Sequence, residues 1–88
     1  MAKTILIVDD SSSLRTVVRM ALVRAGYDVI EAGDGKEGLA QLDKAGKVNL
    51  IVSDVNMPNM DGITFVTHVK AHPRHKFTPV VMLTTEGQ

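Results

Sequence analysis

The chain alternates short, nearly continuous apolar runs with longer stretches in which apolar residues recur every three or four positions. A short continuous run is typical of a strand buried on both faces, whereas the wider spacing is typical of a helix that buries one face. The runs predict strands at residues 4–8, 27–32, 50–54 and 79–83. Because strands and helices alternate, the pattern predicts an α/β fold with a parallel sheet and right-handed crossovers.

The stretch after the first strand predicts a helix with defined ends. Its apolar residues recur at helical spacing: Leu14, Val17, Val18, Ala21, Leu22 and Ala25. Arg15 and Arg19 lie away from this stripe. Ser11, Ser12 or Ser13 can cap the start, because a serine hydroxyl accepts a hydrogen bond from an unpaired N–H of the first turn. Gly26 follows the last apolar residue, as a left-handed C-terminal cap requires.

Two further helices complete the alternation. Asp34 and Glu37 are spaced as a capping box, so a helix starts there and ends near residues 45–46. A third helix covers about residues 62–71, with Ile63, Val66 and Val69 on one side, and a proline at position 73 prevents its extension. Each helix therefore joins two strands of the expected sheet.

Composition narrows the class of protein. The 88 residues are 44% apolar and contain no cysteine, which predicts one globular domain over residues 1–88 without disulfides or thiolate metal sites. Ten basic and ten acidic residues cancel, so no overall field recruits nucleic acid or an anionic membrane. No apolar run approaches the roughly 18 residues of a membrane span, and the start does not resemble a signal peptide. We therefore expect a cytoplasmic protein without nucleic-acid or membrane partners.

Acidic and hydroxyl side chains stand at the ends of three expected strands: Asp9 and Asp10 after the first, Asp54 at the end of the third, and Thr84 after the fourth. The carboxyl ends of parallel strands share one edge, where open α/β sheets bind ligands. If the first and third strands are neighbours, about 4.8 Å apart, the three carboxylates meet.

Such a meeting would be unfavourable without a counter-charge. Two carboxylates about 5 Å apart repel by roughly 3 kcal/mol at an effective dielectric of 20, and the nearby sequence offers no Lys or Arg to neutralise them. Either some of the acids protonate or a cation binds among them, and hard oxygen ligands select Mg²⁺ or Ca²⁺. Mg²⁺ that keeps several waters suits a site with few protein ligands better.

A divalent ion beside a carboxylate, with the Thr84 hydroxyl nearby, would support phosphoryl transfer to an aspartate. Acids at strand ends are also common as solvated caps and turns, and this plainer interpretation competes for each aspartate taken singly. Pro58, Asn59 and the pair Asp61 with Gly62 supply turn residues after the third strand, so a structured loop is expected there.

Three segments together resemble the receiver domain of two-component response regulators. They run from Ile7 to Ser11, from Ser53 to Gly62 and from Val81 to Thr84. The likeness follows the whole chain in order and is greatest with single-domain chemotaxis regulators. It implies a doubly wound, flavodoxin-like sheet with strand order 2-1-3-4, in which the first and third strands are neighbours.

The resemblance also implies roles for individual residues. Asp54 would accept a phosphoryl group from a histidine kinase or phosphotransfer domain, and Thr84 would be the switch hydroxyl. Asp10, Asp54 and the backbone carbonyl of Asn56 would bind Mg²⁺, with Asp9 helping through a water molecule. The first helix, with its arginines, resembles the face that docks the kinase. The domain would be a signalling module that phosphorylates and dephosphorylates itself, not a turnover enzyme.

The family pattern continues beyond residue 88, with a fifth strand that ends in a lysine and with two further helices that are missing here. We therefore expect the fourth strand to form an exposed apolar edge and one face of the sheet to be uncovered, which favours a homo-oligomer. The alternative function is a truncated half-domain that is incompetent in signalling and acts only through self-association.

Other interpretations are weaker. A Mg²⁺-dependent phosphohydrolase with an aspartate nucleophile would place a second acid two residues further on, where this chain has Asn56. His68, His72 and His75 lack an acid or cysteine that would complete a metal site, so we expect incidental surface histidines. No glycine-rich loop follows the first strand, which disfavours a nucleotide-binding doubly wound domain.

Overall fold

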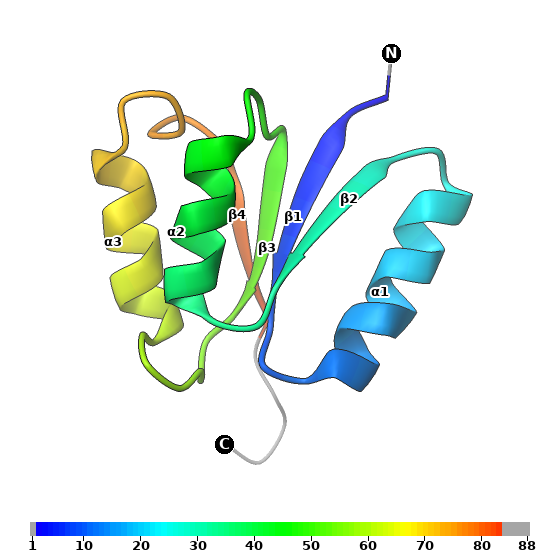
Figure 1. Ribbon diagram of the computed structural model, residues 1–88, viewed down its shortest axis with the longest axis horizontal. Coiled ribbons are helices and arrows are strands. Elements are labelled where there is room, and N and C mark those ends of the chain that lie inside the picture. Colours follow the sequence, from blue (N-terminus) through cyan, green and yellow to red (C-terminus); the bar gives the residue numbers. More distant parts are fainter. Residues whose placement is uncertain (1, 84–88) are drawn as a thin grey trace.

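The computed structural model describes residues 2–83, which form one sheet with helices on both faces (Figure 1). In chain order the elements are β1 Thr4–Val8, α1 Ser12–Arg24, β2 Asp28–Ala32, α2 Gly35–Lys44, β3 Leu50–Asp54, α3 Gly62–Ala71 and β4 Val80–Leu83. Every expected helix and strand is present; β1, β3 and α3 have the predicted bounds, and the other elements differ from theirs by one or two residues.

The four strands are parallel and lie in the order β2-β1-β3-β4, which confirms the expected flavodoxin-like arrangement. Val8, the last residue of β1, pairs with Ser53 of β3, and Asp54 pairs with Leu83 of β4. The carboxyl ends of β1 and β3 are therefore adjacent at one end of the sheet, where the chain leaves each strand and turns toward the next helix.

Helices α2 and α3 cover one face of the sheet, and the main hydrophobic core lies beneath them (Figure 1). Its fully buried members come from three strands, two helices and one loop: Leu6, Val8, Ala32, Leu42, Val48, Ile51, Phe65 and Val69. A side chain at Gly38 of α2 would place its Cβ 3.0 Å from Phe65 of α3. This glycine therefore lets the two helices approach each other.

The buried side of α3 differs from the expected one. Phe65 and Val69 are fully buried, whereas Ile63, which was predicted to share a face with Val69, is 64% exposed. The prediction followed the β-branched residues, but the large Phe65 ring fits against Gly38 and contributes more apolar surface to the core.

Helix α1 lies on the opposite face and is loosely packed (Figure 1). Ser11 caps its start by accepting a hydrogen bond from Leu14, and Gly26 follows its end with a φ of 99°, as predicted. None of its residues is buried, however, and Val17 is 65% exposed. This face of the sheet is therefore less covered than the other among the described residues.

Within the described sheet β4 is an edge strand, as expected, and Val81 on its α1 side is 47% exposed. Thr84, the expected switch hydroxyl, lies outside residues 2–83. No helix among the described residues is long and apolar enough to span a membrane.

Candidate functional site

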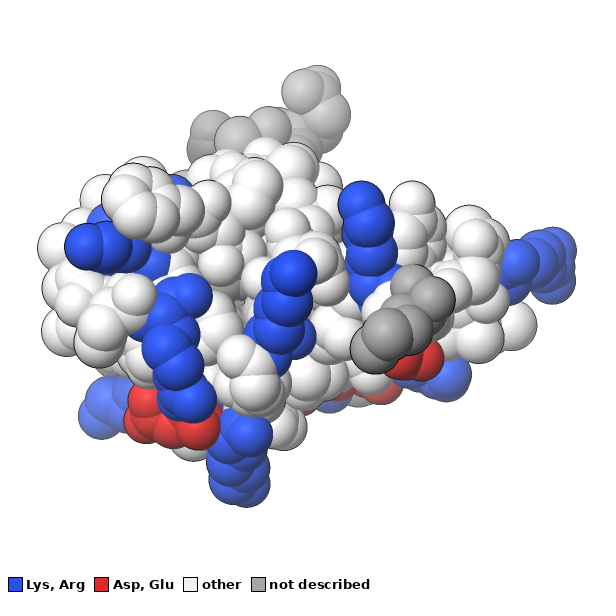
Figure 2. Space-filling model, turned by 90° about the horizontal axis from the view of Figure 1, so that it is seen from above, with Lys and Arg blue, Asp and Glu red and all other residues white. Residues whose placement is uncertain are grey.

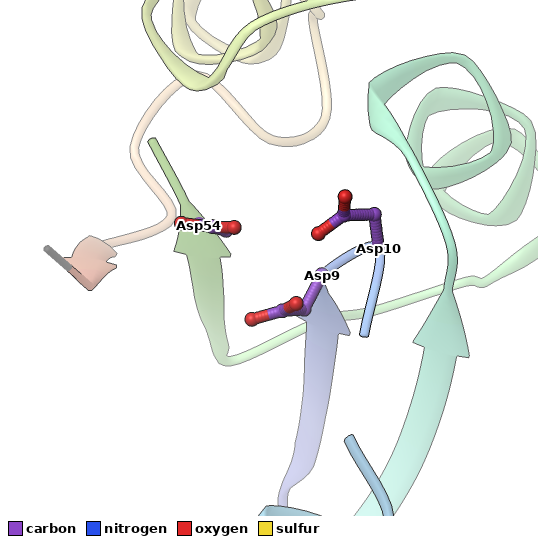
Figure 3. Close-up of side chains that lie close together, drawn as sticks. All are labelled: Asp9, Asp10 and Asp54. Atoms are coloured by element: carbon purple, nitrogen blue, oxygen red, sulfur yellow. The ribbon is translucent and has the colours of Figure 1, made fainter. Parts of the chain in front are cut away.

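Three carboxylates meet at the carboxyl edge of the sheet, as the sequence predicts. Asp9 and Asp10 directly follow β1, and Asp54 is the last residue of β3 (Figure 3). One carboxylate oxygen of each lies within 4.8 Å of one oxygen of each of the others. The pairing of β1 with β3 produces this cluster, because it places two segments that are distant in sequence side by side.

Asp9 is the most constrained of the three. Its side chain is 3% exposed, and one carboxylate oxygen accepts a hydrogen bond from the backbone N–H of Ser11 at 2.8 Å. Burial raises the pKa of Asp9 above its ordinary value, and the charges of Asp54 and Asp10 raise it further, although the Ser11 N–H and Arg15 oppose the shift. The folded chain therefore holds a carboxylate in a place that disfavours its charge.

One cation does lie near the cluster, contrary to the expectation that nothing would neutralise it. Arg15 donates a hydrogen bond from Nη1 to the backbone carbonyl of Asp9 at 2.6 Å, and its Nε pairs with Glu31 at 3.2 Å. Arg19 pairs with the other oxygen of Glu31 at 3.1 Å. Both arginines therefore bind the carboxylate of Glu31 on β2. The guanidinium of Arg15 is thus already paired with Glu31, and the three aspartates of the cluster have no other cation near them among the described residues.

The backbone around Asp54 is tightly folded. The N–H of Asn56 points to the Asp54 carboxylate at 3.4 Å, and the N–H of Gly62 donates to the carbonyl of Val55 at 2.8 Å. A Cβ at position 62 would collide with the Asp54 carbonyl and lie 2.9 Å from the Val55 Cα. Only glycine fits there, so the start of α3 is held directly against the end of β3.

The loop between Asp54 and α3 is anchored to the start of α2. Asn59 adopts a left-handed conformation with a φ of 68° and donates a hydrogen bond to Asp34 at 2.9 Å. Asp34 also caps α2 by accepting from the N–H of Glu37 at 2.8 Å, which confirms the capping residue. These two hydrogen bonds lower the pKa of Asp34, with the Glu37 N–H the stronger cause.

The same anchor has an apolar part that the sequence did not reveal. Met60 packs so closely over Gly35 that a Cβ at position 35 would lie 2.8 Å from the Met60 sulfur. The cap of α2 is thus also the support for the loop after Asp54. The spacing of Asp34 and Glu37 identifies a helix start, but no local pattern shows that a loop 25 residues away binds it.

The donor set fits a hard divalent cation. Asp9, Asp10 and Asp54 supply only carboxylate oxygens, two of the three residues are buried, and Asp10 is exposed at the rim. Within residues 2–83 this is the one group of three or more acidic, histidine or cysteine side chains close enough to share an ion. Carboxylate oxygens suit Mg²⁺ and Ca²⁺, and an open rim leaves room for the waters that Mg²⁺ retains.

The histidines form no comparable group. One of them, however, is buried, although all three were expected at the surface. His75 is 1% exposed, and its Nε2 lies 3.1 Å from the carbonyl of Leu42 at the end of α2. His72 packs against it with ring centroids 4.7 Å apart and pairs with Asp43 at 3.0 Å. Both rings therefore connect the loop after α3 to the end of α2.

Comparison with known proteins gives a consistent result. Residues 5–88 match the family model described as the response regulator receiver domain. The chain is 43% identical over 84 residues to the chemotaxis protein CheY1 of Helicobacter pylori (strain J99), a match that covers 94% of this chain and 68% of that protein.

Solved structures agree with the sequence match. The chemotaxis response regulator CheY4 of Vibrio cholerae superposes with a TM-score of 0.93 at 48% identity, covering 100% of this chain and 72% of that one. The response regulator TrrA of Thermotoga maritima, solved in complex with Mg²⁺ and BeF, gives a TM-score of 0.85 at 27% identity, covering 97% and 71%. The chain thus spans about two thirds to three quarters of the length of these relatives.

Proposed function

The chain belongs to the response regulator receiver domain family, and we propose that it is a phospho-accepting switch in a chemotaxis phosphorelay, with Asp54 as the acceptor. The observation that carries this proposal is the convergence of three carboxylates within 4.8 Å at the carboxyl edge of a parallel sheet. Repulsion among them favours a cation, and a cation beside a buried aspartate favours attack on a phosphoryl group.

Mg²⁺ is the proposed metal. Asp10, Asp54 and the backbone carbonyl of Asn56 would hold it, with Asp9 contributing through water. When bound, the ion would neutralise the carboxylates and the oxygens of the incoming phosphoryl group. The Mg²⁺ and BeF complex of the Thermotoga maritima relative supports this choice, because that receiver binds the same metal on the same fold.

Phosphoryl transfer places definite demands on Asp54. One carboxylate oxygen attacks the phosphorus of a phosphohistidine, so a P–O bond forms while the P–N bond to the donor breaks and the imidazole keeps the electron pair. Asp54 is 9% exposed and fixed at the end of β3, so its carboxylate meets the donor in one orientation. The Thr84 hydroxyl is the proposed donor to a phosphoryl oxygen after transfer.

The phosphoryl donor is proposed to be a histidine kinase or a phosphotransfer domain, since receiver domains of this family work with histidine kinases. Helix α1 adjoins the acidic cluster and exposes Leu14, Val17 and Met20 between 43% and 65%. Such a surface suits docking of another helix. We propose no turnover reaction beyond self-phosphorylation and self-dephosphorylation, because Asn56 stands two residues after Asp54, where a phosphohydrolase would place its second acid.

The direct test is incubation of the chain with Mg²⁺ and acetyl phosphate, followed by mass spectrometry. We expect a labile mass increase of one phosphoryl group, mapped to Asp54 and absent in EDTA. Asp54→Asn removes the acceptor. Asp28→Asn is the matched control, because Asp28 is exposed at the start of β2, at the end of the sheet that lies away from the acidic cluster. An adduct that survives Asp54→Asn, or no adduct with Mg²⁺, would refute the proposal.

A second candidate function is self-association through the β4 edge and the α1 face. The specific observations are the edge position of β4, the 47% exposure of Val81 and the absence of any buried residue in α1. An unpaired apolar edge is a template for another strand. Analytical ultracentrifugation tests this: a dimer weakened by Val81→Lys supports it, and a stable monomer at micromolar concentration contradicts it.

A further inference from the structure

The charges of this neutral chain are strongly separated between the amino ends and the carboxyl ends of its strands. The amino-end side of the sheet, opposite the acidic cluster, carries most of the basic residues: Lys3, Arg24, Lys44, Lys47, Lys70, Arg74 and Lys76. Only Asp28 and Asp43 oppose them on this side among residues 2–83. Figure 2 looks down on it and shows Lys and Arg side chains in a band across the surface, with few acidic ones between them.

Part of this charge has a plain structural reason. Arg24, Lys44 and Lys70 stand in the last turns of α1, α2 and α3, where a cation interacts favourably with the negative end of the helix dipole. Lys47 and Arg74 have no such place, because both lie in loops. Within the described residues neither forms an ion pair with a carboxylate.

These two loop cations line a pocket of about 260 Å³ between the loop that precedes β3 and the loop that precedes β4. The rest of its wall is formed by Gly46, Val48, Asn49, Phe77, Thr78 and Pro79. Arg74 is fixed by a hydrogen bond from Nη2 to the carbonyl of Asp43 at 3.0 Å, which leaves Nε and Nη1 to bind an anion. The pocket therefore combines an oriented guanidinium with a nearby ammonium group.

The floor of the pocket is rigid. Asn49 accepts a hydrogen bond from the N–H of Thr4 at 2.9 Å, and its own N–H donates to the Thr4 carbonyl at 2.8 Å. Thr78 is buried and its hydroxyl points to the carbonyl of Val48 at 3.4 Å. The loop before β3 is thus tied to β1, and the loop before β4 is tied to the loop before β3, so a ligand would meet a largely preformed site.

An aromatic ring stands at the mouth of the pocket. Phe77 is 87% exposed, although a phenylalanine normally gains by burial, and the Lys76 ammonium lies 5.2 Å from its ring centroid. A planar ligand group that stacks on this ring would cover it, while an anionic group of the same ligand contacts the two loop cations. Phosphate matches an arginine fork and a lysine better than a single carboxylate does, because it offers more acceptor oxygens.

We propose that this pocket, defined by Lys47, Arg74 and Phe77, binds a phosphorylated small molecule that carries an aromatic ring, of the size of a mononucleotide. The phosphate would lie between Lys47 and Arg74, and the ring would stack on Phe77. The volume limits the ligand to a small molecule, because the pocket is just below the usual range of about 300–1,000 Å³ for ligand sites. The site is separate from the acidic cluster and does not depend on it.

The test is an NMR titration of the isotope-labelled chain with adenosine monophosphate, inorganic phosphate and adenosine, all in EDTA. Saturable shifts confined to residues 46–49 and 74–79 are expected with the nucleotide. Phosphate should bind more weakly at the same residues, and adenosine should cause no comparable shift. The chelator excludes metal-dependent binding at the acidic cluster, and Asp54→Asn must leave the nucleotide affinity unchanged.

Substitutions identify the groups that bind. Lys47→Gln and Arg74→Gln should each weaken nucleotide binding about tenfold, the usual cost of losing a hydrogen bond from a charged group. Arg24→Gln is the matched control, because it removes the same charge from the same edge but lies outside the pocket, and it should change nothing. Phe77→Ala should weaken the binding of the nucleotide and leave that of phosphate unaltered.

Several results would overturn the proposal. Shifts spread over all basic residues, or an equal loss in Arg24→Gln, would indicate a diffuse charge effect without a site. Adenosine that binds as well as its monophosphate would show that the cations have no role. Cosedimentation with anionic lipid vesicles in the absence of nucleotide binding would make this edge a membrane-facing surface instead.

Discussion

Replacing Asp9 with asparagine should stabilise the metal-free chain while removing part of its response to Mg²⁺. The Asp9 carboxylate is 3% exposed and lies within 4.8 Å of two others. Burial disfavours the Asp9 charge, one such pair repels by about 3 kcal/mol at an effective dielectric of 20, and the Ser11 N–H and Arg15 offset part of this penalty. Asparagine keeps an oxygen for the Ser11 N–H and removes the charge, so a net gain of about 1–2 kcal/mol is expected.

The pH dependence of this gain follows from the raised pKa of Asp9. The folded chain binds this proton more tightly than the unfolded chain, so the wild type loses stability as the pH rises from 3.8 through the raised pKa. Above that range the penalty is constant. Asp9→Asn should be free of this loss, and its advantage over the wild type should disappear at pH values below 3.8, where Asp9 is protonated in both states.

The assay is thermal unfolding followed by circular dichroism at neutral pH, in EDTA and in excess Mg²⁺. A gain of 1 kcal/mol corresponds to about 4–8 °C for a domain of this size. Mg²⁺ at about 100 times its Kd should stabilise the wild type by about 2.7 kcal/mol and Asp9→Asn by less. Asp28→Asn, at the other edge, should match the wild type in both buffers. An Asp9→Asn protein that melts below the wild type in EDTA, or responds equally to Mg²⁺, would refute this reasoning.

Three further predictions concern the support of the site. Gly62→Ala should cost about 3 kcal/mol in urea denaturation and slow phosphorylation by acetyl phosphate, because the new methyl group collides with the Asp54 carbonyl; an unchanged rate would contradict the proposed close approach. Asp34→Ala should lower the melting temperature at neutral pH but much less at a pH below the lowered pKa of Asp34, because the stabilisation is present above the ordinary pKa of 3.8 and lost as the pH falls through the folded value; an equal loss at both pH values would contradict this. Gly38→Ala should fail to stabilise α2 despite a gain of about 1 kcal/mol in helix propensity, since its Cβ would lie 3.0 Å from Phe65; a more stable variant in the same denaturation would show that the helices can move apart.

Much of the fold and the core of the site could be predicted from local patterns. Strands were visible as apolar runs, and the caps at Ser11 and Asp34 have side chains that bind the first turn of a helix. The meeting of Asp9, Asp10 and Asp54 required only that β1 and β3 be neighbours, which the family resemblance supplied. These features depend on residues close in sequence or on the direction of the strands.

The features that were missed depend on contacts between distant segments. Glu31 of β2 binds Arg15 and Arg19, a pairing that periodicity within α1 does not reveal. His75 is buried because its ring reaches the carbonyl of Leu42, 33 residues away, at the end of another helix. Ile63 is exposed because α3 turns the larger Phe65 to the core. Each outcome is decided by packing between elements, which a single sequence does not display.

The central claim is that the three aspartates hold one hard divalent cation beside the acceptor carboxylate. Mn²⁺ has the same preference for oxygen ligands as Mg²⁺ and broadens the NMR signals of nuclei close to it, so a substoichiometric Mn²⁺ titration locates the ion. The amide signals of Asp9, Asp10, Asp54 and Asn56 should broaden first, and added Mg²⁺ or the Asp54→Asn substitution should restore them. Broadening centred on Asp28, Asp34 or Asp61, or broadening at the cluster that Asp54→Asn leaves unchanged, would contradict the claim.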